Sequence, residues 1–207
     1  MTNMLSQRHL ATCAACLLWA SPLLAIDKSE VREKWHTPFD LYLSAREAHD
    51  MKTADPDGVL FIDVRTRQEV HYIGMAEAID AHIPFRFDTT EWKPKSDGER
   101  GIFRRELNFD FEKAVEIALK SKGLDKSAPV IIMCTSGSRA PYAAGALHDA
   151  GFKQVYTQVE GFEGVKAKSG PDKGKRVVAG WKVEGLPWSY NLYTEKMYFN
   201  FDPTVTD

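Results

Sequence analysis

The sequence predicts an α/β fold with a mostly parallel sheet, in a single domain with insertions. Three short apolar runs typical of buried strands, 59–62, 129–133 and 155–159, alternate with stretches typical of helices. Such alternation is typical of parallel sheets whose faces are covered by helices. A length of 207 residues, with 43% hydrophobic and 27% charged residues, fits one domain of this kind.

The predicted helices are delimited by capping and turn residues. Ser44 and Glu47 have the spacing of a capping box, which predicts a helix to about residue 53, before the turn 55–58. Asp110 is a predicted N-cap for a helix whose apolar face repeats at helical spacing and which ends at Gly123. A third helix is predicted over 141–150.

The charge of the chain excludes two classes of protein. The net charge is −2, which argues against a strongly basic nucleic-acid-binding protein and against a highly acidic disordered tail. We therefore expect no nucleic acid as a partner. No apolar run reaches the roughly 18 residues of a membrane span, so no span is expected after processing.

Residues 1–25 have the pattern of a secretory signal peptide. Arg8 and His9 precede an apolar stretch over 10–20, and a helix breaker, Pro22, precedes a small residue, Ala25. Cleavage after Ala25 would place the protein in the periplasm or outside the cell. The alternative is an uncleaved amphipathic helix.

Cleavage would leave one cysteine. Cys13 and Cys16 would depart with the signal peptide, and Cys134 would remain. A single cysteine cannot form an internal disulfide, so Cys134 is either a buried passenger or a reactive thiol.

Segments outside the core elements are predicted as decorations. Residues 26–40 form an N-terminal lead-in, and 189–207 form a C-terminal arm that packs on the domain. Two polar, turn-rich stretches, about 86–105 and 166–176, are predicted insertions. Arginines of the first insertion form either a solvated basic patch or a field that attracts an anionic donor; they are Arg100, Arg104 and Arg105. Three tryptophans are predicted to be packing residues: Trp92, Trp181 and Trp188.

The residues around Cys134 favour a reactive thiol. The sulfur is predicted to lie between the end of a strand and the start of a helix, where loop amides and the positive helix end favour a sulfur anion. The predicted binding loop consists of Thr135, Ser136, Gly137, Ser138 and Arg139. Gly137 permits a tight turn, the serines offer hydroxyl donors, and Arg139 adds either a positive charge or a structural ion pair.

The length of this loop favours sulfur chemistry. Four residues separate Cys134 from Arg139, whereas phosphatases with a catalytic cysteine have a longer loop in a wider cradle. A smaller ring of amides suits one sulfur atom better than a tetrahedral phosphate. A phosphatase-like or arsenate-reducing enzyme is therefore the less favoured alternative.

Several motifs, in order, resemble the single-domain rhodanese (thiosulfate sulfurtransferase) family. They cover 41–188, the predicted rhodanese domain, and comprise Asp63-Val64-Arg65, His82-Ile83-Pro84, the 134–139 loop, Gly180-Trp181 and Gly185-Leu186-Pro187-Trp188. The chain departs from the family pattern at Phe85 and Arg86, in the long spacer before His82, and at Ala140. These departures concern the substrate pocket and leave Cys134 unchanged.

The resemblance implies a rhodanese-like parallel sheet flanked by helices on both faces, and a catalytic Cys134 that carries a persulfide. It implies a small anionic sulfur donor such as thiosulfate, an external thiol or cyanide as acceptor, and no cofactor. No metal site is expected, because the histidines outside the leader lack paired ligand spacing. Asp63 and Arg65 are predicted to brace the sheet end near the loop. His82 is predicted to satisfy loop backbone groups, and the alternative is that it contacts the substrate. The alternative function is a non-catalytic binding or sulfur-carrier module for a periplasmic partner.

Overall fold

The computed structural model describes residues 26–199, and the predicted signal peptide and the end of the C-terminal arm lie outside them. Its centre is a five-stranded sheet in the order β1-β8-β7-β2-β4, and every neighbouring pair is parallel. The strands are β1 (Tyr42–Leu43), β2 (Leu60–Asp63), β4 (Ala81–His82), β7 (Pro129–Met133) and β8 (Gln154–Gln158). The prediction of an α/β fold with a parallel sheet is confirmed.

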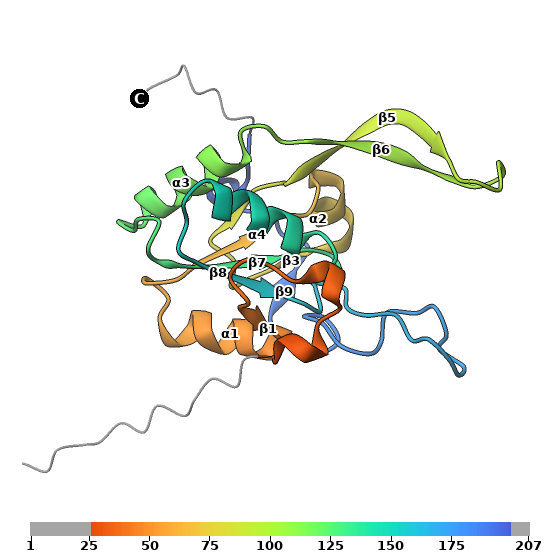
Figure 1. Cartoon of the computed structure of the whole chain (residues 1–207), viewed down its shortest axis with the longest axis horizontal. Coiled ribbons are helices and arrows are strands. Elements are labelled where there is room, and N and C mark those ends of the chain that lie inside the picture. The colour runs from red at the N-terminus through yellow and green to blue at the C-terminus, as the bar shows by residue number, and fades with distance from the viewer. Residues whose placement is uncertain (1–25, 200–207) are drawn as a thin grey trace, which may run out of the picture.

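Helices cover both faces of this sheet (Figure 1). They are α1 (Ala45–Ala54), α2 (Arg67–Ile73), α3 (Phe111–Ser121) and α4 (Ala140–Asp149). Apolar side chains of α3 and α4 share one buried cluster with Leu60 and Val130 of the sheet. Side chains of α1 share a second cluster with Phe61 and Trp181. The core therefore has two layers, one on each side of the strands, as covered parallel sheets require.

The predicted helix signals are largely confirmed. Ser44 accepts a hydrogen bond from the Glu47 amide, and Glu47 accepts one from the Ser44 amide, so the capping box exists. Gly123, after α3, has the positive φ of 71° that favours glycine there. Asp110 occupies the N-cap position of α3, but its side chain makes no capping hydrogen bond.

The first predicted insertion is a β-hairpin, which the sequence analysis missed. Strands β5 (Arg86–Pro94) and β6 (Gly101–Leu107) pair antiparallel with each other and form a separate two-stranded sheet. The hairpin projects from the body of the molecule (Figure 1). Because both of its faces meet solvent along much of its length, its strands lack the buried alternation that would have identified them.

Of the three tryptophans predicted to be packing residues, Trp92 departs from the prediction because more than half of it is exposed. Its side chain is 53% exposed on the hairpin, where it contacts the ring of Phe103 edge-on. Trp181 is fully buried, and Trp188 is half-buried.

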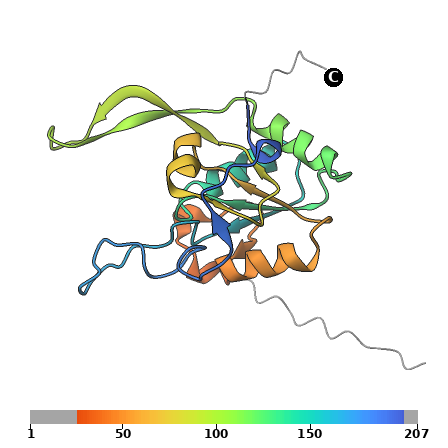
Figure 2. The same ribbon diagram turned by 180° about the vertical axis from the view of Figure 1, so that it is seen from behind.

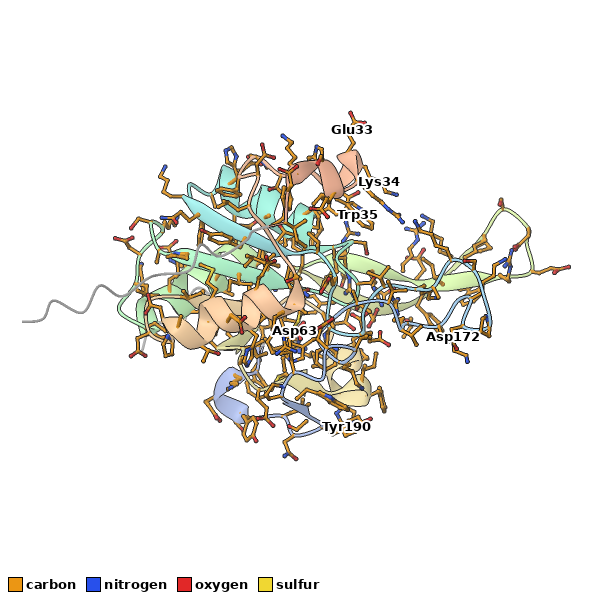
Figure 3. The ribbon with its side chains drawn as sticks, turned by 90° about the horizontal axis from the view of Figure 1, so that it is seen from below. Glu33, Lys34, Trp35, Asp63, Asp172 and Tyr190 are labelled. Carbon is orange, nitrogen blue, oxygen red and sulfur yellow. The ribbon has the colours of Figure 1, made fainter. Side chains whose placement is uncertain are left out.

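The second predicted insertion, 166–176, is a loop closed by an isolated β-bridge between Lys166 and Arg176. It projects from the same side of the molecule as the hairpin (Figures 1 and 2). Figure 3 shows Asp172 on this loop, whereas Asp63 lies at the centre of the molecule. The two projections therefore lie on one side of the fold.

The remaining short elements tie the chain ends to the domain. Short 3₁₀-helices span Lys28–Glu30, Glu33–Trp35 and Thr194–Lys196, and β3 (Met75–Ala76) pairs with β9 (Trp188–Ser189). The part of the C-terminal arm that is described packs on the domain, because Met197 forms a bridge with His82 and Tyr198 is buried. Between residues 26 and 199, none of the helices has the length and apolar character needed to span a membrane.

Candidate active site

Cys134 follows β7, the central strand of the parallel sheet, and its side chain is fully buried. The backbone N–H of Arg139 donates a hydrogen bond to the Sγ atom over 3.4 Å. Since α4 begins at Ala140, this amide belongs to the N-terminal end of that helix, where backbone N–H groups and the helix dipole favour negative charge. The sulfur thus lies where an anion is stabilised.

Two glycines allow the loop to pack tightly. Gly137 has a φ of 79°, and a Cβ atom there would lie 1.7 Å from the carbonyl oxygen of Val159. Gly161 has a φ of 77°, and a Cβ atom there would lie 2.2 Å from the amide nitrogen of Ser136. The amide of Phe162 also donates to the carbonyl of Cys134 over 2.7 Å. Residues 159–162, which follow β8, therefore pack closely against the 134–139 loop.

The Arg139 side chain forms an ion pair, the alternative that the sequence analysis left open. Its guanidinium donates two hydrogen bonds to the carboxylate of Glu69, over 2.7 and 2.6 Å. The Thr135 hydroxyl accepts from the same guanidinium and donates to Glu69 over 2.6 Å. The charge of Arg139 is therefore compensated within the site.

Glu69 is not among the site residues predicted from the sequence, although it belongs to a recognisable capping motif. Thr66 and Glu69 have the spacing of a capping box, and both of its hydrogen bonds are formed at the start of α2. Burial by itself would raise the pKa of Glu69, but the hydrogen bonds and positive charge of Arg139 outweigh it and lower the pKa to about 2. Glu69 therefore remains ionised and links the start of α2 to the cysteine loop.

A second buried ion pair supports the neighbouring strand end. Asp63 and Arg65 are fully buried, and the guanidinium of Arg65 binds the Asp63 carboxylate and the carbonyl of Gly74. The guanidinium also lies over the ring of Phe162, 3.9 Å from the ring centre. These contacts join β2 to the segment behind the cysteine loop, which is the bracing role predicted for Asp63 and Arg65.

His82 also has a supporting position. Its Nε2 atom lies 2.9 Å from the carbonyl oxygen of Arg65, and its ring is fully buried. Burial lowers the pKa of His82, which favours the neutral ring. The His82 ring thus forms a hydrogen bond with the backbone carbonyl of Arg65.

The other residues of the predicted loop differ in how far they are buried. Gly137 is buried, and Ser136 and Ser138 are half-buried.

Two arginines of the first predicted insertion, Arg104 and Arg105, lie on the hairpin and form ion pairs. Arg104 pairs with Glu91. Arg105 pairs with Asp88 and also lies 3.7 Å from the carboxylate of Glu69. Within the described part of the chain, no group of three or more His, Cys, Asp or Glu side chains is placed to hold a metal ion.

A parallel sheet with a cysteine loop at the end of its central strand defines the class of this protein. Residues 44–168 match the rhodanese-like domain, so the chain belongs to the rhodanese-like family. Sulfur transfer is supported at the level of this family.

Individual similar proteins share most of the domain. An uncharacterised protein of Rickettsia rickettsii, the RP600 homolog, is 28% identical over 148 residues, which are 72% of this chain and 96% of that protein. The uncharacterised protein RC0915 of Rickettsia conorii is 27% identical over 150 residues, again 72% and 96% of the two chains. Among solved structures, Rv0390 from M. tuberculosis is 25% identical with a TM-score of 0.51, and the alignment covers 72% of this chain and 97% of that one.

Proposed function

We propose that the protein transfers sulfane sulfur from a small anionic donor such as thiosulfate to an external thiol or cyanide, through a persulfide on Cys134. The observation that carries this proposal is the hydrogen bond from the Arg139 amide to the Cys134 Sγ, at the start of α4. A sulfur anion placed there is stabilised by a fixed donor and by the helix dipole.

The transfer consists of two half-reactions. The Cys134 thiolate attacks the outer sulfur of thiosulfate, a new S–S bond forms, and the bond to the sulfonate breaks, so that sulfite leaves with the electron pair. The acceptor nucleophile then attacks the outer sulfur of the persulfide. That S–S bond breaks, and Cys134 regains its thiolate.

Stabilisation of the bound sulfur is assigned mainly to backbone amides. The Arg139 guanidinium is compensated by Glu69, so little of its charge is free for the sulfur. Its backbone N–H, in contrast, is directed at Sγ. Arg139 therefore has two separate roles: its amide binds the sulfur, and its side chain holds the loop to α2.

Once residues 1–25 are removed, the acceptor must come from another molecule. Cys134 is the only cysteine among residues 26–199, and it is free. No second thiol of the described chain is present to release the sulfur as an internal disulfide. Cys134 is fully buried, whereas Ser136 and Ser138 of the same loop are half-buried and therefore partly open to solvent.

Intact-protein mass spectrometry before and after incubation with thiosulfate tests the proposal. The expected result is a gain of one sulfur atom that cyanide removes and that Cys134→Ser abolishes. Ser121→Ala, on the outer end of α3, is the matched control and should gain the sulfur normally. A free Cys134 thiol with no gain from thiosulfate or from a polysulfide would refute the proposal. An in vivo role that survives Cys134→Ser would favour the binding-module alternative.

We also propose that residues 1–25 direct export and are removed after Ala25. The proposal rests on the sequence pattern alone. The mass of the protein isolated from its native cells tests it: a chain that begins at Ile26 is expected, and a chain that retains residues 1–25 would overturn it.

A further inference from the structure

Two grooves flank the cysteine loop, one on each side. The first, the hairpin groove, lies between α2, the start of α4 and the β5–β6 hairpin, and Arg139 lines it. The second, the loop groove, lies between the N-terminal 3₁₀-helices and the 166–176 loop, and Ser136 lines it. The two projecting segments thus form the outer walls of grooves that meet at the loop carrying Cys134.

Both grooves are positively charged, although the chain as a whole has a net charge of −2. In the hairpin groove, the carboxylates of Glu69 and Asp88 face five cationic side chains: Arg86, Lys93, Arg104, Arg105 and Arg139. In the loop groove, Glu30 and Glu160 face another five: Arg32, Lys166, Lys168, Lys173 and Arg176. Positive charge is therefore concentrated in the two grooves beside the cysteine loop.

Six of these ten cations form no ion pair within the described part of the chain. Arg104 and Arg105 pair with carboxylates of the hairpin, and Arg139 pairs with Glu69. Within residues 26–199, no ion pair involves the following side chains: Arg32, Arg86, Lys93, Lys166, Lys168 and Lys173. Such charges remain available to an anionic partner and steer its approach.

The hairpin groove also presents large apolar side chains to solvent. Tyr72, Trp92, Phe103 and Tyr142 line it, and each of them is more than half exposed. Exposed aromatic residues rimmed by charge are typical of protein-binding surfaces. The volume of the groove, about 1250 Å³, also exceeds the roughly 300–1,000 Å³ of small-molecule sites. A small donor such as thiosulfate would leave most of it empty.

We propose that the two grooves dock an acidic partner protein whose cysteine thiol accepts the sulfur from Cys134. This inference rests on the proposed function, because it names the acceptor of the same site. A second copy of the chain is disfavoured, since two copies that met at these faces would bring like charges together. A nucleic acid would match the charge, but it offers no thiol to take the sulfur.

The test compares acceptors for the full chain loaded with persulfide. The probes are two synthetic peptides with one cysteine and the same apolar residues, which carry four Asp in one peptide and four Lys in the other, together with cyanide. The acidic peptide is expected to react at least tenfold faster than the basic one at low salt. This preference should shrink as the salt concentration rises.

Charge reversal at the two grooves should remove the preference. Lys93→Glu/Lys168→Glu, with one exposed lysine from each groove, is expected to slow the acidic peptide at least tenfold and to leave the cyanide rate within twofold. Lys113→Glu/Lys153→Glu is the matched control, because both lysines are exposed outside the two grooves. It should leave all three rates within twofold. Trp92→Ala provides a second variant, in which the acidic peptide should slow while the cyanide rate stays unchanged.

The outcomes separate this inference from the proposed function. Equal rates for the two peptides, or an unchanged ratio in Lys93→Glu/Lys168→Glu, overturn the inference, while persulfide transfer to cyanide leaves the proposed function intact. Absence of any persulfide overturns both. A dimer seen by sedimentation that charge reversal dissociates assigns the grooves to a second copy. Tight binding of a single-stranded oligonucleotide, without a peptide preference, assigns them to nucleic acid.

Discussion

Replacement of Glu69 by glutamine tests how strongly the ion pair with Arg139 holds the site together. The change removes one negative charge and keeps the shape of the side chain. Glutamine also satisfies the N3 position of a capping box, so α2 retains its capping pattern. Any large loss of stability therefore reports the missing charge together with the loss of one oxygen that accepts hydrogen bonds from Arg139.

The magnitude follows from the pKa of Glu69, which the site lowers from 4.5 to about 2. This lowering corresponds to about 3 kcal/mol in favour of the ionised form. The Arg139 side chain is only 13% exposed, so it would be left with its charge largely out of water. Removal of one partner from a buried pair typically costs about 3–5 kcal/mol. We expect Glu69→Gln to lose about 3 kcal/mol at pH 7.

The pH dependence gives a second check. Because the pKa of Glu69 is lower in the folded chain, its stabilisation is present above pH 4.5 and is lost as the pH falls towards 2. Linkage predicts that the difference between wild type and Glu69→Gln shrinks from about 3 kcal/mol at pH 7 to about 1 kcal/mol at pH 3.

Urea unfolding at pH 7 and pH 3 measures both quantities. Glu91→Gln is the matched control, since Glu91 pairs with Arg104 while its side chain is 62% exposed. Exposed pairs contribute at most about 1 kcal/mol, so this control should unfold close to wild type. A loss below about 1 kcal/mol for Glu69→Gln at pH 7, or a loss that is equal at both pH values, would refute the reasoning.

Three further predictions concern the parts that hold the loop. Gly137→Ala should lose persulfide loading and at least about 2 kcal/mol of stability, because the new Cβ atom would clash with the Val159 carbonyl. Gly98→Ala is the control: Gly98 also has a positive φ, but no atom lies near its Cβ position, so the change should cost only about 1–2 kcal/mol. Arg65→Met should cost about 3–5 kcal/mol in urea unfolding by leaving the buried Asp63 unpaired, and adding Asp63→Asn should recover part of the loss. Because burial lowers the pKa of His82, its neutral ring stabilises the fold above about pH 6.5 and this contribution is lost at lower pH; unfolding between pH 7 and 5 should therefore show a drop that His82→Asn reduces.

The central fold was accessible from sequence because its signals are local. The apolar run at 129–133 and the capping box at Ser44 each depend on a few neighbouring residues, and both exist in the structure. The hairpin was not accessible, since β5 and β6 are stabilised by each other and expose both faces to solvent. Burial periodicity, the main signal for a strand, is absent there.

The site divides in the same way. The cysteine loop was found because strand, loop and helix follow one another in sequence. Glu69 lies far from Arg139 in sequence, and only the packing of α2 beside the loop brings the two together. Its place in a capping box was readable, but nothing in that motif indicates which arginine the carboxylate will meet.

The hairpin has one consequence for how the protein could be changed. Its strands pair only with each other, and Arg86 and Leu107 face each other at its base. The five-stranded sheet contributes no strand to it and takes none from it. The outer part of the hairpin, residues 89–104, is therefore replaceable: a short turn, or a hairpin with other side chains, could take its place, while Phe87 keeps its packing on the core and Arg105 keeps its contact with Glu69. Under the proposed docking, related proteins could therefore differ in the hairpin, and so in the acceptor that they bind, while the loop around Cys134 stays the same.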